Sequence, residues 1–146
     1  MGGKVKQILA DSFAAMGLPE DASTFLLKMW DIIQILDDIK DGHQIEDVDG
    51  SIYTLLFGLP TDEFFYRFRP VLTGAMLTAY YKWQAANAAE QSKIHLDKAY
   101  MWRAGYYDLI LLVAALCLPQ ERVQELAPQI MALYGETRED YLKEFS

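Results

Sequence analysis

Residues 25–42 read FLLKMWDIIQILDDIKDG, and this stretch decides the fold. Its apolar residues recur at spacings of three and four, which is the signature of an amphipathic helix. The apolar stripe consists of Phe25, Met29, Ile32, Ile33, Leu36 and Ile39. Gly42 follows as a stop signal, because glycine readily adopts the left-handed conformation that ends many helices. We therefore expect a helix over about residues 22–41.

The same spacing continues in both directions from this helix. It predicts a helix over about residues 4–16, a short helix capped by Asp49 or Ser51 that ends before Gly58, and another capped by Thr61. Pro70 either breaks the pattern or lies in the first turn of a helix that runs to about residue 90. Further helical pattern follows in three segments, from Ser92 to about Cys117, from Pro119 onward, and after Gly135.

No segment shows the sustained alternation of apolar and polar residues that strands require, and β-branched residues are sparse. The predicted fold class is all-α, a bundle of about five to seven helices in one domain over residues 1–146. A chain of 146 residues that is 52% hydrophobic can bury a core without disulfides. A single cysteine, Cys117, excludes an intrachain disulfide, and we expect it to be a buried, inert thiol.

The formal net charge of -8 argues against binding to nucleic acid or to an anionic membrane, because both need clustered Lys and Arg. The first residues lack the apolar stretch of a signal peptide, and the apolar run Leu109–Leu118 is too short to span a membrane. The predicted location is cytoplasmic.

The predicted helix over residues 22–41 carries a cluster of aspartates that could bind a metal ion. At about 100° per residue, Asp31, Asp37, Asp38 and Asp41 all lie on the side away from the apolar stripe. Carboxylates four residues apart, such as Asp37 and Asp41, are neighbours on a helix and can share a Mg²⁺ ion. The candidate metal ligands are therefore Asp37, Asp38 and Asp41.

Residues Gln34–Gly42 resemble the aspartate-rich DDxxD motif of polyprenyl diphosphate synthases. The resemblance implies Mg²⁺ or Mn²⁺ bound together with a diphosphate. Those synthases need a second such motif and about twice this length, so we reject synthase activity itself. A metal-dependent enzyme acting on a diphosphate or a nucleotide stays open as the alternative function.

A different interpretation of the same helix face is a surface that another protein covers. Trp30 lies at about 120° on the same wheel, among the carboxylates, and an aromatic side chain there favours packing against a helix, a partner or a ligand. The candidate partner-facing residues are Trp30, Asp31 and Asp38. A solvated face with no partner is the plain structural alternative.

Three further residues need an interpretation. Asp108 precedes an apolar run, so we expect it to be partly buried and paired with Arg103, Lys82, Arg67 or Arg69. His43 and His95 have no Cys or His at metal-ligand spacing and are expected to be exposed. The sequence contains no Gly-rich phosphate loop, no GxSxG motif and no Cys–His arrangement for catalysis.

The chain over about residues 30–110 resembles small helical proteins of unassigned function that tailed bacteriophages encode. The resemblance rests on short pieces, namely Trp30, Asp38, Asp41-Gly42, residues 59–67, Pro70-Val71-Leu72, residues 83–87 and residues 103–108. It implies a phage or prophage origin and no mechanism.

The leading functional hypothesis is therefore a non-enzymatic helical protein that acts through protein–protein contacts and needs no cofactor. Mg²⁺ or Mn²⁺ enters only under the enzyme alternative. A third hypothesis is an acidic mimic of nucleic acid, and assembly into a homo-oligomer is also left open.

Overall fold

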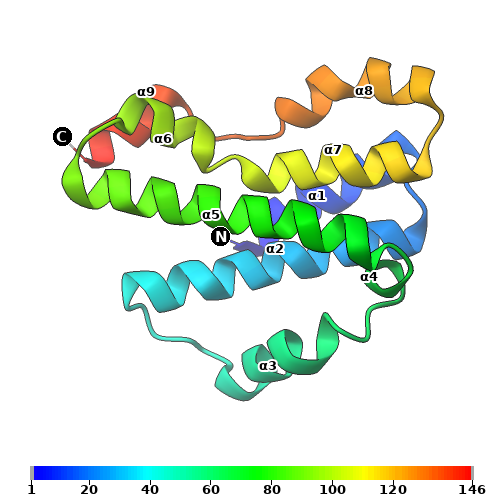
Figure 1. Ribbon diagram of the computed structural model, residues 1–146, viewed down its shortest axis with the longest axis horizontal. Coiled ribbons are helices and arrows are strands. Elements are labelled where there is room, and N and C mark those ends of the chain that lie inside the picture. Colours follow the sequence, from blue (N-terminus) through cyan, green and yellow to red (C-terminus); the bar gives the residue numbers. More distant parts are fainter. Residues whose placement is uncertain (1, 146) are drawn as a thin grey trace. The chain divides into compact units, whose positions relative to one another are not determined.

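The computed structural model describes residues 2–145, and this part of the chain is helical throughout, with no strand (Figure 1). Seven of its helices have seven residues or more, and two α-helices and one π-helical turn are shorter. The all-α fold class is thereby confirmed. The chain divides into two compact units, residues 1–69 and 70–146, which we describe separately. The expectation of one domain over residues 1–146 stays a prediction.

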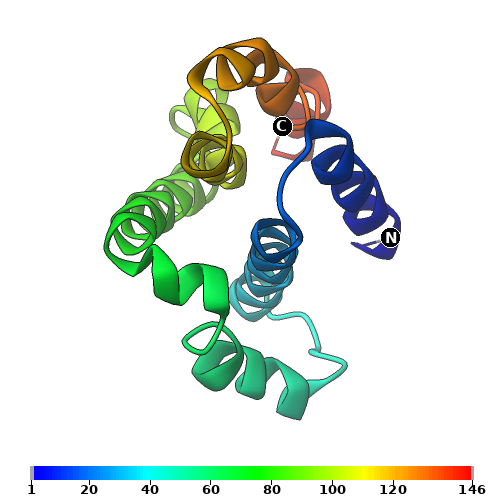
Figure 2. The same cartoon turned by 90° about the vertical axis from the view of Figure 1, so that its right-hand side faces the viewer.

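The first unit is built on the long helix predicted from residues 25–42. Helix α1 spans Gly2–Met16, α2 spans Glu20–Asp41, α3 spans Val48–Tyr53 and α4 spans Glu63–Arg67. Figure 2 looks almost along α2, with α1 beside it, and these two helices pack together. Between α3 and α4 the chain forms a single π-helical turn, η1, at Thr54–Gly58.

Helix α2 ends as its sequence predicts. Gly42 has a φ of 72°, in the left-handed region, and its N–H bonds the carbonyls of Asp38 and Ile39. Two predicted N-caps are wrong, and each observed cap is a nearby aspartate. Asp47 caps α3 in place of Asp49 or Ser51, because its carboxylate accepts a bond from the Gly50 N–H, and Asp62 caps α4 in place of Thr61.

Aromatic and aliphatic side chains of α1, α2 and α4 form the buried interior of the first unit. Phe25 on α2 packs on Phe64 of α4 with ring centroids 5.5 Å apart, and both side chains are fully buried. The other buried large residues of these helices are Leu9, Phe13, Met16, Leu26, Met29 and Ile32. The stripe predicted for α2 is confirmed over its first half, whereas Ile39 in the last turn is exposed.

The second unit contains α5 (Arg69–Ser92), α6 (Leu96–Trp102), α7 (Gly105–Cys117), α8 (Gln120–Met131) and α9 (Arg138–Glu144). Pro70 lies in the first turn of α5, where a missing N–H costs nothing. The segment from Ser92 to Cys117 is two helices, because Lys93 and His95 adopt positive φ and the chain breaks again at residues 103–104. At the second break, Gly105 lies close to α5, since a Cβ there would lie 3.4 Å from Ala79 Cβ.

Helices α7 and α8 pack against each other, as do α6 and α9, whose buried Ala99 and Tyr141 form a cluster with Ala86 and Ala89 of α5. The apolar helix α7 has one open side, on which Asp108 and Ala115 are exposed and Leu111 and Leu112 are half-buried. Among the described residues, no helix combines the length and the hydropathy that a membrane crossing requires.

Candidate functional site: an exposed apolar surface with an acidic border

The aspartates predicted as metal ligands lie in the last two turns of α2. Asp37 and Asp38 are half-buried and Asp41 is exposed. His43 Nδ1 lies 3.6 Å from the Asp38 carboxylate. Within residues 2–145, the structure brings together no group of three or more His, Cys, Asp or Glu side chains that could hold a metal ion. The assignment of Asp37, Asp38 and Asp41 to a metal stays a prediction.

The predicted partner-facing residues are partly engaged within their own unit. Lys6 of α1 forms an ion pair with Asp31 at 2.8 Å, and Trp30 is half-buried. Helix α1 thus reaches this face of α2 through the Lys6–Asp31 ion pair. Asp38 remains close to half exposed at the other end of this face.

The most open apolar surface of the first unit lies on α3 and the π-helical turn. It consists of Val48, Ile52, Tyr53, Leu56 and Phe57, which we call the α3–η1 surface, and each of these residues is 48–62% exposed. No residue of α3 or of η1 is buried. The Tyr53 and Phe57 rings lie against each other with centroids 5.7 Å apart. Five large apolar side chains in ten residues are thus left facing solvent together.

A π-helical turn is rare and is frequently found at functional sites. In η1 the Leu59 N–H bonds the Thr54 carbonyl at 3.0 Å, which inserts one extra residue into the turn. The Thr54 hydroxyl also donates to the Gly50 carbonyl at 2.9 Å.

The start of α3 depends on one close approach of side chain and backbone. The Asp47 carboxylate caps the Gly50 N–H at 3.0 Å, and a Cβ on residue 50 would lie only 2.0 Å from Asp47 Oδ2. A side chain at position 50 would therefore displace the cap. This explains why a glycine occurs inside so short a helix.

A polar clamp holds the other end of this segment. Lys28 Nζ on α2 donates to the Gly58 carbonyl at 3.1 Å and to the Asp62 carboxylate at 2.9 Å. Asp62 accepts in addition from the Phe65 N–H at 3.0 Å, and its side chain is only 5% exposed. The clamp thus fixes the end of η1 and the start of α4 on the middle of α2.

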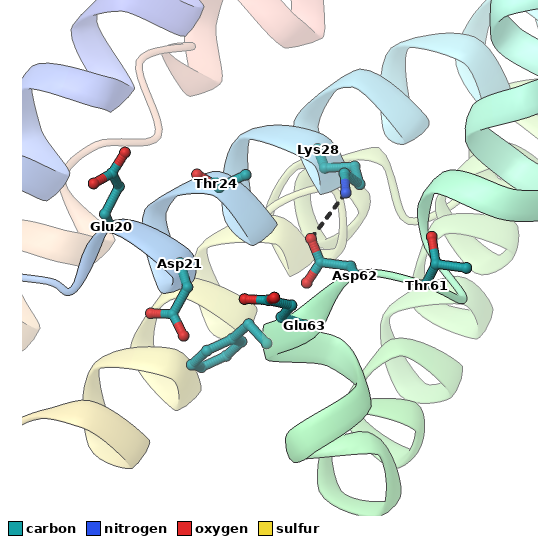
Figure 3. Close-up of a pocket in the computed structure, with 8 residues that line it drawn as sticks. Glu20, Asp21, Thr24, Lys28, Thr61, Asp62 and Glu63 are labelled. Atoms are coloured by element: carbon teal, nitrogen blue, oxygen red, sulfur yellow. Dashed lines mark hydrogen bonds and ion pairs between the residues drawn. The ribbon is translucent and has the colours of Figure 1, made fainter.

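An open pocket of about 510 Å³ adjoins the clamp (Figure 3). Its lining comes from the start of α2 and the segment that enters α4, namely Glu20, Asp21, Thr24, Lys28, Thr61, Asp62, Glu63 and Phe64. Figure 3 shows the Lys28 amine turned to Asp62, while Glu20, Asp21 and Glu63 present further carboxylates. The lining holds no histidine and no cysteine.

Carboxylates border the α3–η1 surface along the chain. From residue 41 to residue 63 there are six acidic residues and no Lys or Arg, the six being Asp41, Glu46, Asp47, Asp49, Asp62 and Glu63. All of them except the clamp residue Asp62 are exposed. The nearest cations along the chain are Lys40 and Arg67, and Arg67 is bound to Asp21 at 2.5 Å. Along the chain, the apolar α3–η1 surface thus has exposed carboxylates on both sides, which we call its acidic border.

The second unit contains a polar network that joins its helices. Arg103 donates to both carboxylate oxygens of Glu90, at 2.5 and 2.6 Å, and also to the Asn87 side chain. The Tyr141 hydroxyl donates to Glu90 at 2.7 Å. Burial and this bond to Glu90 raise the Tyr141 pKa, so the phenol stays protonated at neutral pH. These hydrogen bonds and ion pairs among Arg103, Glu90, Asn87 and Tyr141 form a structural link between α5, α6 and α9.

Asp108 is ion-paired as predicted, and its side chain is more open than predicted, 49% exposed on the open side of α7. Its partner is Lys82, one of the four candidates, at 2.7 Å. Cys117 was expected to be buried and is half-buried. His43 and His95 are exposed, as predicted.

The sequence analysis did not identify the α3–η1 surface. A signal was present, because the apolar residues from Val48 to Leu59 cover about 200° of a helical wheel, more than one buried side can take up. The π-helical turn, the clamp and the lack of buried residues have no comparable signal in the sequence.

Comparison of the chain with protein-family models, with curated proteins and with solved structures finds no match. The function therefore has to be argued from the site itself.

Proposed function

We propose that this chain is a non-enzymatic protein-binding module whose contact region is the α3–η1 surface. The observation that carries the proposal is the exposure of Val48, Ile52, Tyr53, Leu56 and Phe57 on a segment with no buried residue. Large contiguous apolar patches with a polar border are typical of interaction sites in soluble proteins.

The composition of the surface supports the same conclusion. Aromatic side chains are enriched in the centres of protein interfaces, where they bury a large area with few rotatable bonds. Tyr53 and Phe57 would supply two such anchors. The surface is also held in place before binding, by the Asp47 cap at one end and the Lys28 clamp at the other. A segment that is already ordered loses less conformational entropy when it binds.

Phage or prophage origin stays part of the proposal, on the resemblance described above. It suggests that the partner is a protein of the virus or of its host.

Site-specific photo-crosslinking tests the proposal. The variant Phe57→p-benzoylphenylalanine would be produced in cells that encode the protein, with Tyr81→p-benzoylphenylalanine on α5 as the matched control. Tyr81 is suitable because its side chain is exposed to a similar degree. We expect a discrete adduct from position 57 that position 81 does not give.

The captured protein would then be purified and its affinity measured for the wild type and for the double variant Ile52→Ser, Leu56→Ser. We expect the affinity to fall at least tenfold in the double variant. Identical adducts from both positions, or an unchanged affinity, would contradict the proposal.

A further inference from the structure

The shape of the α3–η1 surface limits the kind of partner it can take. The surface is carried by 11 residues of helix, about 16 Å long at 1.5 Å per residue. Binding by strand addition needs an open sheet edge, and residues 2–145 contain no strand. A partner helix of about three turns matches this length and would place its apolar residues against Ile52, Leu56 and Phe57.

The acidic border limits the charge of that partner. Exposed carboxylates lie along the chain on both sides of the surface, at Glu46, Asp47 and Asp49 and at Glu63. A helix with Lys or Arg beside its apolar stripe would be attracted to them, whereas an acidic helix would be repelled. We propose that the occupant of the α3–η1 surface is a basic amphipathic helix of another protein. This inference rests on the proposed function and adds the chemistry of the partner.

The charge argues against two other occupants. In a second copy of this chain, the same acidic border would meet itself, and each copy carries a net charge of -8. An anionic membrane would be repelled by the same carboxylates. Electrostatic complementarity thus selects a basic protein segment.

Selection from a displayed peptide library tests the inference on the full chain. The library would consist of 18-residue helices with a fixed leucine stripe and with every polar position drawn equally from Lys, Glu, Gln and Ser. Selection would use the wild type, followed by removal of sequences that also bind the double variant Tyr53→Ser, Phe57→Ser. We expect Lys to be enriched over Glu at the positions next to the stripe.

A selected peptide would then be measured against charge variants. We expect the double variant Glu46→Gln, Asp49→Asn to weaken it three- to tenfold, and higher salt to weaken it as well. The matched control, Glu121→Gln with Glu125→Gln on α8, removes the same charge elsewhere and is expected to leave the affinity unchanged.

The outcomes separate this inference from the proposed function. If the selection enriches neutral or acidic helices whose binding still requires Tyr53 and Phe57, the proposal of a basic partner is wrong, whereas the proposal that the α3–η1 surface binds a protein is kept. Enrichment of no sequence at all would remove both. Two further outcomes would overturn the proposal of a basic helix. A dimer in sedimentation equilibrium that the variant Leu56→Ser abolishes would assign the surface to self-association. Binding to zwitterionic vesicles that the same variant abolishes would assign the surface to lipid.

Discussion

Lys28 is the residue on which the local structure of the contact region depends most. Its amine bonds the Gly58 carbonyl and the Asp62 carboxylate, so it joins α2 to the end of η1 and to the cap of α4. Asp62 is buried, and a buried carboxylate that loses its cation is left with an uncompensated charge. Lys28, near the middle of α2, thus acts as a positioning residue for the neighbouring segment.

The variant Lys28→Met is expected to destabilise the protein by about 2 kcal/mol, because it removes the partner of a buried carboxylate. The matched control is Lys82→Met. Its partner Asp108 is half exposed, and a pair exposed to water is worth less than about 1 kcal/mol. Urea denaturation of both variants measures the difference. Equal effects would mean that the clamp is no stronger than a surface ion pair.

Several properties of single residues could be predicted from the sequence, and those that could not have physical reasons. The sequence predicts Gly42 as a helix end because glycine readily adopts the left-handed conformation, and its φ is 72° in the structure. The sequence limits the ion-pair partner of Asp108 to four candidate cations. It does not predict how exposed Asp108 is, since the orientation of α7 depends on contacts distant in sequence. The Lys28–Asp62 pair joins residues 34 apart, and no local pattern signals a pair of that separation.

At the scale of elements, α2 and the α3–η1 segment differ in how they use their apolar residues. Helix α2 buries five residues on one side, in keeping with its periodic stripe. The α3–η1 segment has apolar residues around more than half of its circumference and buries none of them. Periodicity therefore predicted α2 well and could not predict the environment of α3.

The variant Leu56→Ser is expected to change the free energy of unfolding by less than about 0.5 kcal/mol, because its side chain is already largely exposed. The matched variant Leu26→Ser, in the buried stripe of α2, is expected to cost more than about 3 kcal/mol. Thermal and urea unfolding of the two variants checks this. A large loss of stability in Leu56→Ser would show that Leu56 supports the fold, and the case for a free contact surface would fail.

The aspartates of α2 have a test of their own. We expect millimolar Mg²⁺ or Mn²⁺ to shift the Tm by less than about 1 °C, because two carboxylates on one helix leave most of the coordination shell to water. A metal at a hundred times its Kd would add about 2.7 kcal/mol, equivalent to roughly 5–10 °C. A shift of that size, lost in the double variant Asp37→Asn, Asp41→Asn, would favour the metal-dependent enzyme.

At the scale of the whole molecule, the pH dependence of stability should report on the second unit. Burial and the neighbouring Glu144 raise the pKa of Glu136. A carboxyl group with a pKa that is higher in the folded than in the unfolded state favours folding while it is protonated, and this contribution is lost as the pH rises through the folded pKa. Ionised Glu136 is therefore expected to weaken the fold at neutral pH.

The variant Glu136→Gln is expected to raise the Tm at pH 7 by about 1–2 °C and to have no effect at pH 4, where the carboxyl group is protonated in the wild type. The control Glu139→Gln changes an exposed residue on α9 and is expected to leave the Tm unchanged at both pH values. Thermal unfolding at several pH values measures these shifts in Tm. A lower Tm for Glu136→Gln at pH 7 would contradict the expectation that ionised Glu136 weakens the fold.

Hydrogen exchange tests most directly the proposed binding of another protein at the α3–η1 surface. The full chain would be compared with and without the protein captured at position 57. We predict slower exchange of backbone amides over residues 48–58, and no comparable change in α7 or α8. Slower exchange confined to residues 70–146, with residues 48–58 unchanged, would contradict the assignment of the α3–η1 surface as the binding site.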